Sequence, residues 1–137
     1  DGDGAAACMR NALADARREP DQVGYVCCHG TGTQQNDRIE SKAIHKIFGA
    51  RARSVPVSSI KALTGHMMGA ASAVEAIACV LALREGVLPP TWNHVNLDPE
   101  CDLDVIPNKP RGVRVSLILN NSYAFGGNNA CVAFGGA

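Results

Sequence analysis

Apolar side chains recur at helical spacing in three stretches of the chain. Between residues 4 and 18 they fall three or four positions apart, which predicts an amphipathic helix. A second helix is predicted by an apolar stripe of Ile39, Ala43, Ile44, Ile47 and Phe48. Thr33 or Asn36 can cap this helix, and Gly49 ends it. From 66 to 84 nearly every face is apolar, so we expect this third helix to be buried on most sides until Gly86 ends it.

Short runs of aliphatic and β-branched residues predict strands between and after these helices. Residues 23–28 have the pattern of a buried strand, and residues 55–58 that of a short strand near an edge, because Pro56 cannot donate to a ladder. The runs 113–120 and 129–134 predict a closing hairpin around residues 122–128. This alternation of strands and helices is an α/β layer pattern, and no repeat or linker divides it. We therefore expect one α/β domain over residues 1–137.

Composition narrows the class of protein. With 137 residues, 46% hydrophobic and 19% charged, the chain is expected to fold as one domain or as half of a larger one. A formal net charge of zero argues against nucleic-acid binding, and no apolar run is long enough for a membrane span. The six cysteines form no CxxC pair, and no secretion signal precedes them, so we expect reduced thiols in a cytoplasmic protein. The chain begins with Asp1, as a processed product or a piece of a longer protein would.

Residues with chemical potential follow the predicted strands. His29 ends the first strand, Lys61 and His66 lie between the second strand and the third helix, and residues 123–129 join the last two strands. Reactive groups in α/β sheets collect beyond the carboxyl ends of strands, so we expect these segments to converge. At the start of a buried helix His66 should stay neutral and donate one hydrogen bond to a developing oxyanion. The alternative is that His66 only caps the helix.

Several other sites can be weighed from spacing alone. Gly30 and Gly32 are expected to let a ligand approach closely, whereas Cys28 and His29 point to opposite faces of a strand and cannot form a nucleophilic dyad. Glu75 either pairs with Lys61 or lies on a solvent-facing strip of the helix. No dinucleotide fingerprint, P-loop or local metal-ligand spacing is present, so neither a nucleotide site nor a metal site is expected.

Charged residues also form two patches along the sequence. Arg38, Lys42 and Lys46 form a basic stripe on the second helix, and residues 98–104 are acidic. Such patches are usually solvated faces, but the basic stripe is also a candidate surface for an acidic carrier protein.

Three ordered motifs resemble the C-terminal half of β-ketoacyl-acyl-carrier-protein synthases, most closely the bacterial type II elongating enzymes. The resemblance spans the whole chain and rests on HGTGT at 29–33 with Asp37 and Glu40, SSIKALTGHMMGAASAVE at 58–75, and NSYAFGGNNA at 121–130. It implies a thiolase-like fold of two similar halves, each a five-stranded mixed sheet with helices on both faces. It also implies decarboxylative Claisen condensation of malonyl and acyl thioesters, in fatty acid or polyketide biosynthesis.

The resemblance also implies roles for individual residues. The catalytic set corresponds to His29, His66 and Lys61, supported by Asp37 and Glu75. The gating and oxyanion loop corresponds to Phe125, Gly126 and Gly127, and the substrate-binding hydroxyls to Thr31 and Thr33. No cofactor or metal is implied, because substrates arrive on the phosphopantetheine arm of an acyl carrier protein. The implied partners are the N-terminal half, that carrier, and a second ketosynthase subunit in a homodimer or heterodimer.

The sequence also departs from the family pattern. The nucleophilic cysteine of the family lies in a segment that this chain does not contain, so the chain alone is expected to be inactive. Substitutions at 34–36, 72, 123–124 and 128 indicate a subfamily with different acyl substrates. Two alternatives stay open at this stage: a non-catalytic partner akin to chain-length factors, and a free-standing half-domain that binds only protein.

Overall fold

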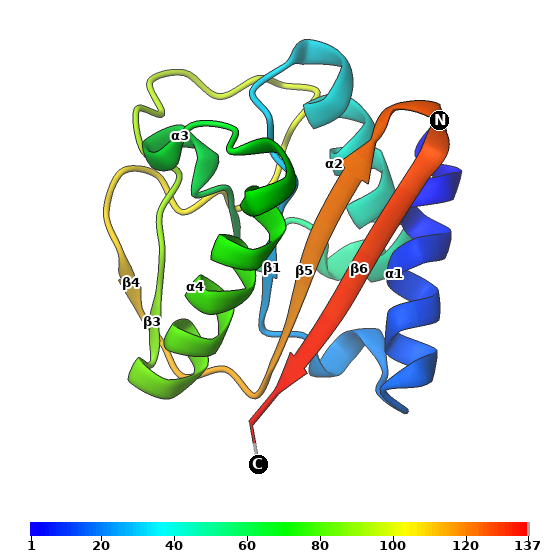
Figure 1. Ribbon diagram of the computed structural model, residues 1–137, viewed down its shortest axis with the longest axis vertical. Coiled ribbons are helices and arrows are strands. Elements are labelled where there is room, and N and C mark those ends of the chain that lie inside the picture. Colours follow the sequence, from blue (N-terminus) through cyan, green and yellow to red (C-terminus); the bar gives the residue numbers. More distant parts are fainter. Residues whose placement is uncertain (137) are drawn as a thin grey trace.

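A four-stranded mixed sheet forms the centre of the computed structural model, which describes residues 1–136. Strand β1 (Tyr25–Cys27) is fully buried and pairs in parallel with β2 (Val57–Ser58) on one side and with β5 (Leu117–Ala124) on the other. Strand β6 (Asn128–Gly135) runs antiparallel to β5, which gives the order β2-β1-β5-β6 (Figure 1). The position of β2 at an edge confirms the prediction made from Pro56.

The mixed sheet is confirmed, but the expected number of five strands is wrong for residues 1–136. Strands β3 (Val87–Leu88) and β4 (Arg111–Gly112) pair with each other in a separate antiparallel ribbon instead of joining the main sheet. These two strands flank the long connection 89–110, and their pairing holds the two ends of the connection side by side. A backbone hydrogen bond from Val113 to Gly86 extends this pairing.

Helices cover both faces of the sheet, as expected. On one face α1 (Asp3–Asp15) and α2 (Gln34–Phe48) pack against the strands, and on the other face lies α4 (Ala71–Glu85) (Figure 1). The two faces have separate apolar cores, because successive side chains of β1 point to opposite sides. Val26 packs in the α1/α2 core, whereas Tyr25 and Cys27 pack in the α4 core.

Several element boundaries differ from the sequence expectation. The first helix ends at Asp15 because Arg17 has a left-handed φ of 52°. Strand β5 continues to Ala124, so only the short turn Phe125–Gly127 joins it to β6. As predicted, Thr33 caps α2 and Gly49 ends it. The remaining 3-10 turns are Pro20–Gln22, Gly49–Arg51 and Met68–Ala70.

The helix predicted from residue 66 begins only at Ala71. A one-turn helix α3 (Lys61–Thr64) precedes it, and positive φ values at Gly65 and Met68 interrupt the helical path. Nor is α4 buried on most sides, since Ile77, Val80 and Leu81 are 60%, 50% and 42% exposed. Their exposure follows from position, because nothing within residues 1–136 covers that face. No helix in this part of the chain is long and apolar enough to span a membrane.

The basic stripe of α2 is largely neutralised within the chain. Arg38 contacts Glu100 at 2.9 Å and Asp98 at 3.5 Å, and Lys46 contacts Asp3 at 2.6 Å. The acidic stretch 98–104 therefore lies along α2. This pairing removes the main argument for using the stripe as a carrier-binding surface.

Candidate active site

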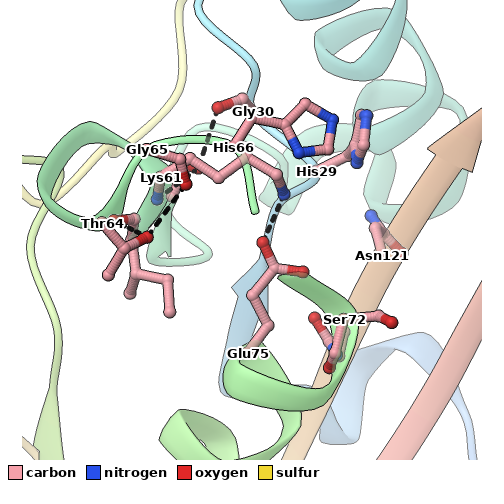
Figure 2. A network of polar contacts seen from close by, with 12 residues as sticks. His29, Gly30, Lys61, Thr64, Gly65, His66, Ser72, Glu75 and Asn121 are labelled. Carbon is pink, nitrogen blue, oxygen red and sulfur yellow. Dashed lines mark hydrogen bonds and ion pairs between the residues drawn. The ribbon is translucent and has the colours of Figure 1, made fainter. Parts of the chain in front are cut away.

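Both histidine segments lie beyond the carboxyl ends of β1 and β2, where the sequence placed them. His29 follows β1, and His66 lies in the loop between α3 and α4. Their imidazole ring centroids are 5.6 Å apart with an angle of 83° between the planes (Figure 2). Two parallel strands that end side by side thus bring together residues 37 positions apart in the chain.

The hydrogen bonding of His66 defines which ring nitrogen carries the proton. The backbone N–H of Met68 donates to His66 Nδ1 at 3.3 Å, so Nδ1 is an acceptor and Nε2 is the ring nitrogen that can donate. The expectation that His66 starts the long helix is wrong, because it precedes α4 in an exposed loop. The burial and the helix start on which the expectation of a neutral ring rested are therefore both absent, whereas the expected Nε2–H donor fits the contact at Nδ1.

His29 is held neutral by its surroundings. It is buried, and burial together with the nearby charge of Lys61 lowers its pKa to about 4. At neutral pH the imidazole therefore carries one proton and no charge.

Lys61 and Glu75 form a buried ion pair beside the histidines (Figure 2). This contact confirms the pairing and excludes the alternative that Glu75 lies on a solvent-facing strip. Burial raises the pKa of Glu75, and the Lys61 ammonium opposes that rise. A buried pair of this kind is strongly destabilised when one partner is removed, so each side chain fixes the other.

Glu40 is a site residue that the analysis of individual residues did not single out. Its Oε1 accepts the backbone N–H of His29 at 2.9 Å and the side-chain amide of Asn121 at 3.2 Å, and its Oε2 accepts the N–H of Gly30 at 2.9 Å. Burial raises the pKa of this carboxyl, and the two backbone donors oppose the rise. The signal was available, because Glu40 precedes Ala43 and Ile44 by three and four positions on the buried face of α2.

Asp37 lies close to this network without contacting either histidine ring. Its carboxylate accepts the side-chain amide of Asn36 at 3.0 Å in the first turn of α2. The hydroxyls of Thr31 and Thr33 are 3.2 Å apart, and Thr33 Oγ1 also accepts the N–H of Asn36 at 3.3 Å. Within residues 1–136, it is Glu40 and not Asp37 that holds the backbone of His29.

A cavity of about 680 Å³ opens beside these residues. Its walls come from the loop after β1, the segment after β2 and the connection between β3 and β4, and include Thr31, Thr33, Asp37, Lys61, His66 and Trp92. Cavities of this size bind small organic ligands in other proteins. The arrangement places hydrogen-bond donors at a space large enough for a substrate.

The turn that carries Phe125 lies at the tip of the β5–β6 hairpin. Phe125 is fully exposed, and Gly126 and Gly127 have φ values of 79° and 81°, which favour glycine. From the predicted segment 123–129, the residue that reaches the histidines is Tyr123, whose ring centroid is 5.5 Å from that of His29. Tyr123 lies in β5, which begins and ends four residues later than the predicted run 113–120.

Two further expectations concern the residues around His29. Cys28 is buried in the α1/α2 core, and burial raises the pKa of its thiol, which agrees with excluding a Cys28–His29 dyad. Gly30 and Gly32 both line the cavity, so the expectation that a ligand can approach closely here stays a prediction. On the side of its absent Cβ atom Gly30 faces Ser59, whose side chain would collide with a Cβ there, whereas a Cβ at Gly32 would meet nothing within 4 Å.

Comparison with known proteins agrees with this geometry. The family described as beta-ketoacyl synthase, C-terminal domain, matches residues 1–95. Nodulation protein E of Rhizobium leguminosarum bv. trifolii is 52% identical over 132 residues, which cover 96% of this chain and 33% of that protein. The 3-oxoacyl-[acyl-carrier-protein] synthase 2 of Coxiella burnetii is 46% identical over 127 residues, which cover 93% of this chain and 31% of that protein.

A solved structure, the ishigamide ketosynthase/chain length factor, is similar with a TM-score of 0.94 and 45% identity over 98% of this chain and 33% of that one. The chain thus spans about a third of the length of the relatives it matches. The family match and these identities confirm the resemblance that the three motifs indicated, including the thiolase-like fold. The chain belongs to the β-ketoacyl synthase family, and it is the C-terminal domain of such a protein.

Proposed function

We propose that this domain forms the C-terminal half of an enzyme that extends acyl chains by decarboxylative Claisen condensation of malonyl and acyl thioesters. The observation that carries the proposal is the pair of imidazoles, His29 and His66, 5.6 Å apart beside a buried Lys61–Glu75 pair. Relatives of this chain are named 3-oxoacyl-[acyl-carrier-protein] synthase, which supports an acyl carrier protein as the source of both substrates.

The histidines stabilise the charge that develops when malonyl loses carbon dioxide. The carbon–carbon bond to the carboxylate breaks, and its electron pair moves toward the thioester carbonyl, whose oxygen becomes an enolate. Two imidazole N–H groups aimed at that oxygen stabilise the enolate without transferring a proton. The α-carbon then attacks an acyl thioester held on a cysteine of the N-terminal half, and the cysteine thiolate leaves.

The surrounding residues keep His29 neutral. The charge of Lys61 disfavours an imidazolium at His29, and Glu75 holds Lys61 in place. The hydroxyls of Thr31 and Thr33 line the cavity and are suited to bind the amides of a phosphopantetheine arm.

Two roles remain assigned by resemblance. Phe125 gates the acyl site, a role supported by its exposure on a glycine turn that can change conformation. Asp37 supports the loop after His29 from the first turn of α2.

The exposed face of α4 supports an association with the N-terminal half. Ile77, Val80 and Leu81 form an apolar stripe that a stable protein covers. The active form is a homodimer or heterodimer of ketosynthase subunits. It works in the cytoplasm, which the six free thiols support.

The test uses the full-length protein that contains this chain, together with malonyl-loaded carrier protein, and measures released carbon dioxide. We expect the His66→Ala variant to lose decarboxylation, while His45→Ala keeps it. His45 is a suitable control because it pairs with Asp102 on the outer side of α2, at 2.7 Å. Decarboxylation at the wild-type rate by His66→Ala would overturn the assignment.

The second candidate function is a chain-length-factor-like partner that shapes the pocket of a separate ketosynthase. The similarity to a ketosynthase/chain length factor structure favours considering it. Retention of His29, Lys61, His66 and Glu75 in one contact network supports the enzyme. A full-length protein without a nucleophilic cysteine, which releases no carbon dioxide alone but alters product length in a complex, would establish the partner role.

A further inference from the structure

Ser59 connects the two loops that carry the candidate catalytic residues. It directly follows β2 and is 7% exposed. Its hydroxyl donates to the carbonyl of Gly30 at 2.8 Å and accepts the backbone N–H of Lys61 at 3.3 Å. Gly30 is the neighbour of His29, and Lys61 begins the segment that leads to His66 (Figure 2). One hydroxyl thus uses its donor and its acceptor to bridge the His29 loop and the Lys61 segment.

The backbone of Ser59 makes a third connection. Its N–H donates to Thr91 Oγ1 at 3.2 Å, next to Trp92 in the wall of the cavity. The approach to Gly30 is so close that a Cβ atom there would collide with Ser59, and Gly30 also has a φ of 41°. Contact with Ser59 therefore sets how near the two loops lie to each other.

We propose that Ser59 is a positioning residue for the condensation, and this inference rests on the proposed function. Its hydroxyl fixes the separation between the His29 loop and the segment that carries Lys61 and His66. Two donors aimed at one oxygen need that separation, because a misplacement of about 1 Å can reduce a rate on the order of a hundredfold.

Ser58 provides a matched control. It is equally buried, and its hydroxyl also makes two hydrogen bonds, to the Tyr25 hydroxyl at 2.7 Å and to the Pro89 carbonyl at 2.6 Å. Neither partner belongs to the His29 loop or the Lys61 segment. Removing either hydroxyl should therefore cost similar stability, and only Ser59→Ala should disturb the histidines.

The kinetic experiment compares Ser59→Ala with Ser58→Ala in the full-length protein, by melting temperature and by kcat and KM for release of carbon dioxide from malonyl-loaded carrier. We expect similar melting temperatures, a kcat about tenfold lower in Ser59→Ala than in Ser58→Ala, and KM values within about twofold. Ser59→Cys, which keeps a weak donor, should fall between wild type and Ser59→Ala, and it replaces Ser59→Ala if that variant does not fold. Equal losses of kcat in both serine variants would overturn the inference.

A second readout separates this inference from the proposed function. Amide hydrogen exchange in segments 29–33 and 61–66 should accelerate in Ser59→Ala and stay near wild type in Ser58→Ala, whether or not the protein releases carbon dioxide. Equal exchange in the two variants would refute the bridge itself. If neither the wild type nor His66→Ala released carbon dioxide, but Ser59→Ala still exchanged faster than Ser58→Ala, only the proposed function would be refuted.

Discussion

Replacing Glu40 by alanine should destabilise the protein strongly and disorder the loop that carries His29. The carboxylate accepts three hydrogen bonds from buried or half-buried donors: the backbone N–H groups of His29 and Gly30 and the side-chain amide of Asn121. A buried donor left without an acceptor costs about 1–3 kcal/mol. Because water can enter and accept some of these hydrogen bonds, we expect the free energy of unfolding to fall by roughly 4 kcal/mol, which is less than three full penalties.

The glutamine variant separates the contribution of each oxygen. Glu40→Gln keeps one acceptor oxygen and replaces the other by an amide group that cannot accept, so it should lose about 1–3 kcal/mol. Asp37→Asn is the control, because Asp37 lies one turn earlier and Asn36 is the one side-chain hydrogen-bond partner that residues 1–136 give its carboxylate. We expect that change to alter stability by less than about 0.5 kcal/mol.

Urea denaturation of the full-length protein, followed by circular dichroism at neutral pH, measures these differences. Decarboxylation of malonyl-loaded carrier, measured on the folded fraction, reports the position of His29. The expected order of stability is wild type and Asp37→Asn together, then Glu40→Gln, then Glu40→Ala. If the free energies of unfolding of Glu40→Ala and Asp37→Asn differed by less than about 0.5 kcal/mol, the role of Glu40 in holding the His29 backbone would be refuted.

The site and the exposed helix face lead to three further predictions. The imidazole of His29 gains a proton near pH 6.5 in the unfolded chain and only near pH 4 in the folded one. The free energy of unfolding should therefore fall as the pH drops between these values, by at most about 1.4 kcal/mol per pH unit. In His29→Gln, urea denaturation at a series of pH values should show no such fall from this residue. Glu75→Ala leaves the Lys61 ammonium buried without its partner and should cost about 3–5 kcal/mol, whereas Glu75→Gln should cost less in the same denaturation assay. The chain of residues 1–137 alone should self-associate in analytical ultracentrifugation, and Ile77→Lys with Val80→Lys should reduce this, whereas an unchanged association would show that another surface mediates it.

Local sequence patterns predicted the elements well where neighbouring residues decide the conformation. Thr33 and Gly49 bound α2 as the capping pattern predicted, because a cap depends only on backbone groups within one helical turn. The pairing of Lys61 with Glu75 was predictable in the same way, since a carboxylate inside an apolar helix needs a partner and one lysine lay nearby. The order and spacing of the three motifs indicated the β-ketoacyl synthase family, and the comparisons with known proteins confirm that family.

The errors arose where distant segments meet. The start of α4 was placed five residues early, because the apolar pattern does not register the positive φ values at Gly65 and Met68. The contact of Gly30 with Ser59, from a segment 29 residues away, was not predicted either. Glu40 was visible on the buried face of α2, but its partners come from two other segments.

The sequence by itself determined the α/β pattern, the two ends of α2 and the set of chemically capable residues, because each depends on interactions within a few positions. Only the tertiary structure decided which of those residues touch. Parallel pairing of β1 with β2 placed His29 beside His66, and parallel pairing of β1 with β5 brought Asn121 to Glu40. Strand register and loop contact fix such distances, and both are set by packing across the whole domain, which no local spacing encodes.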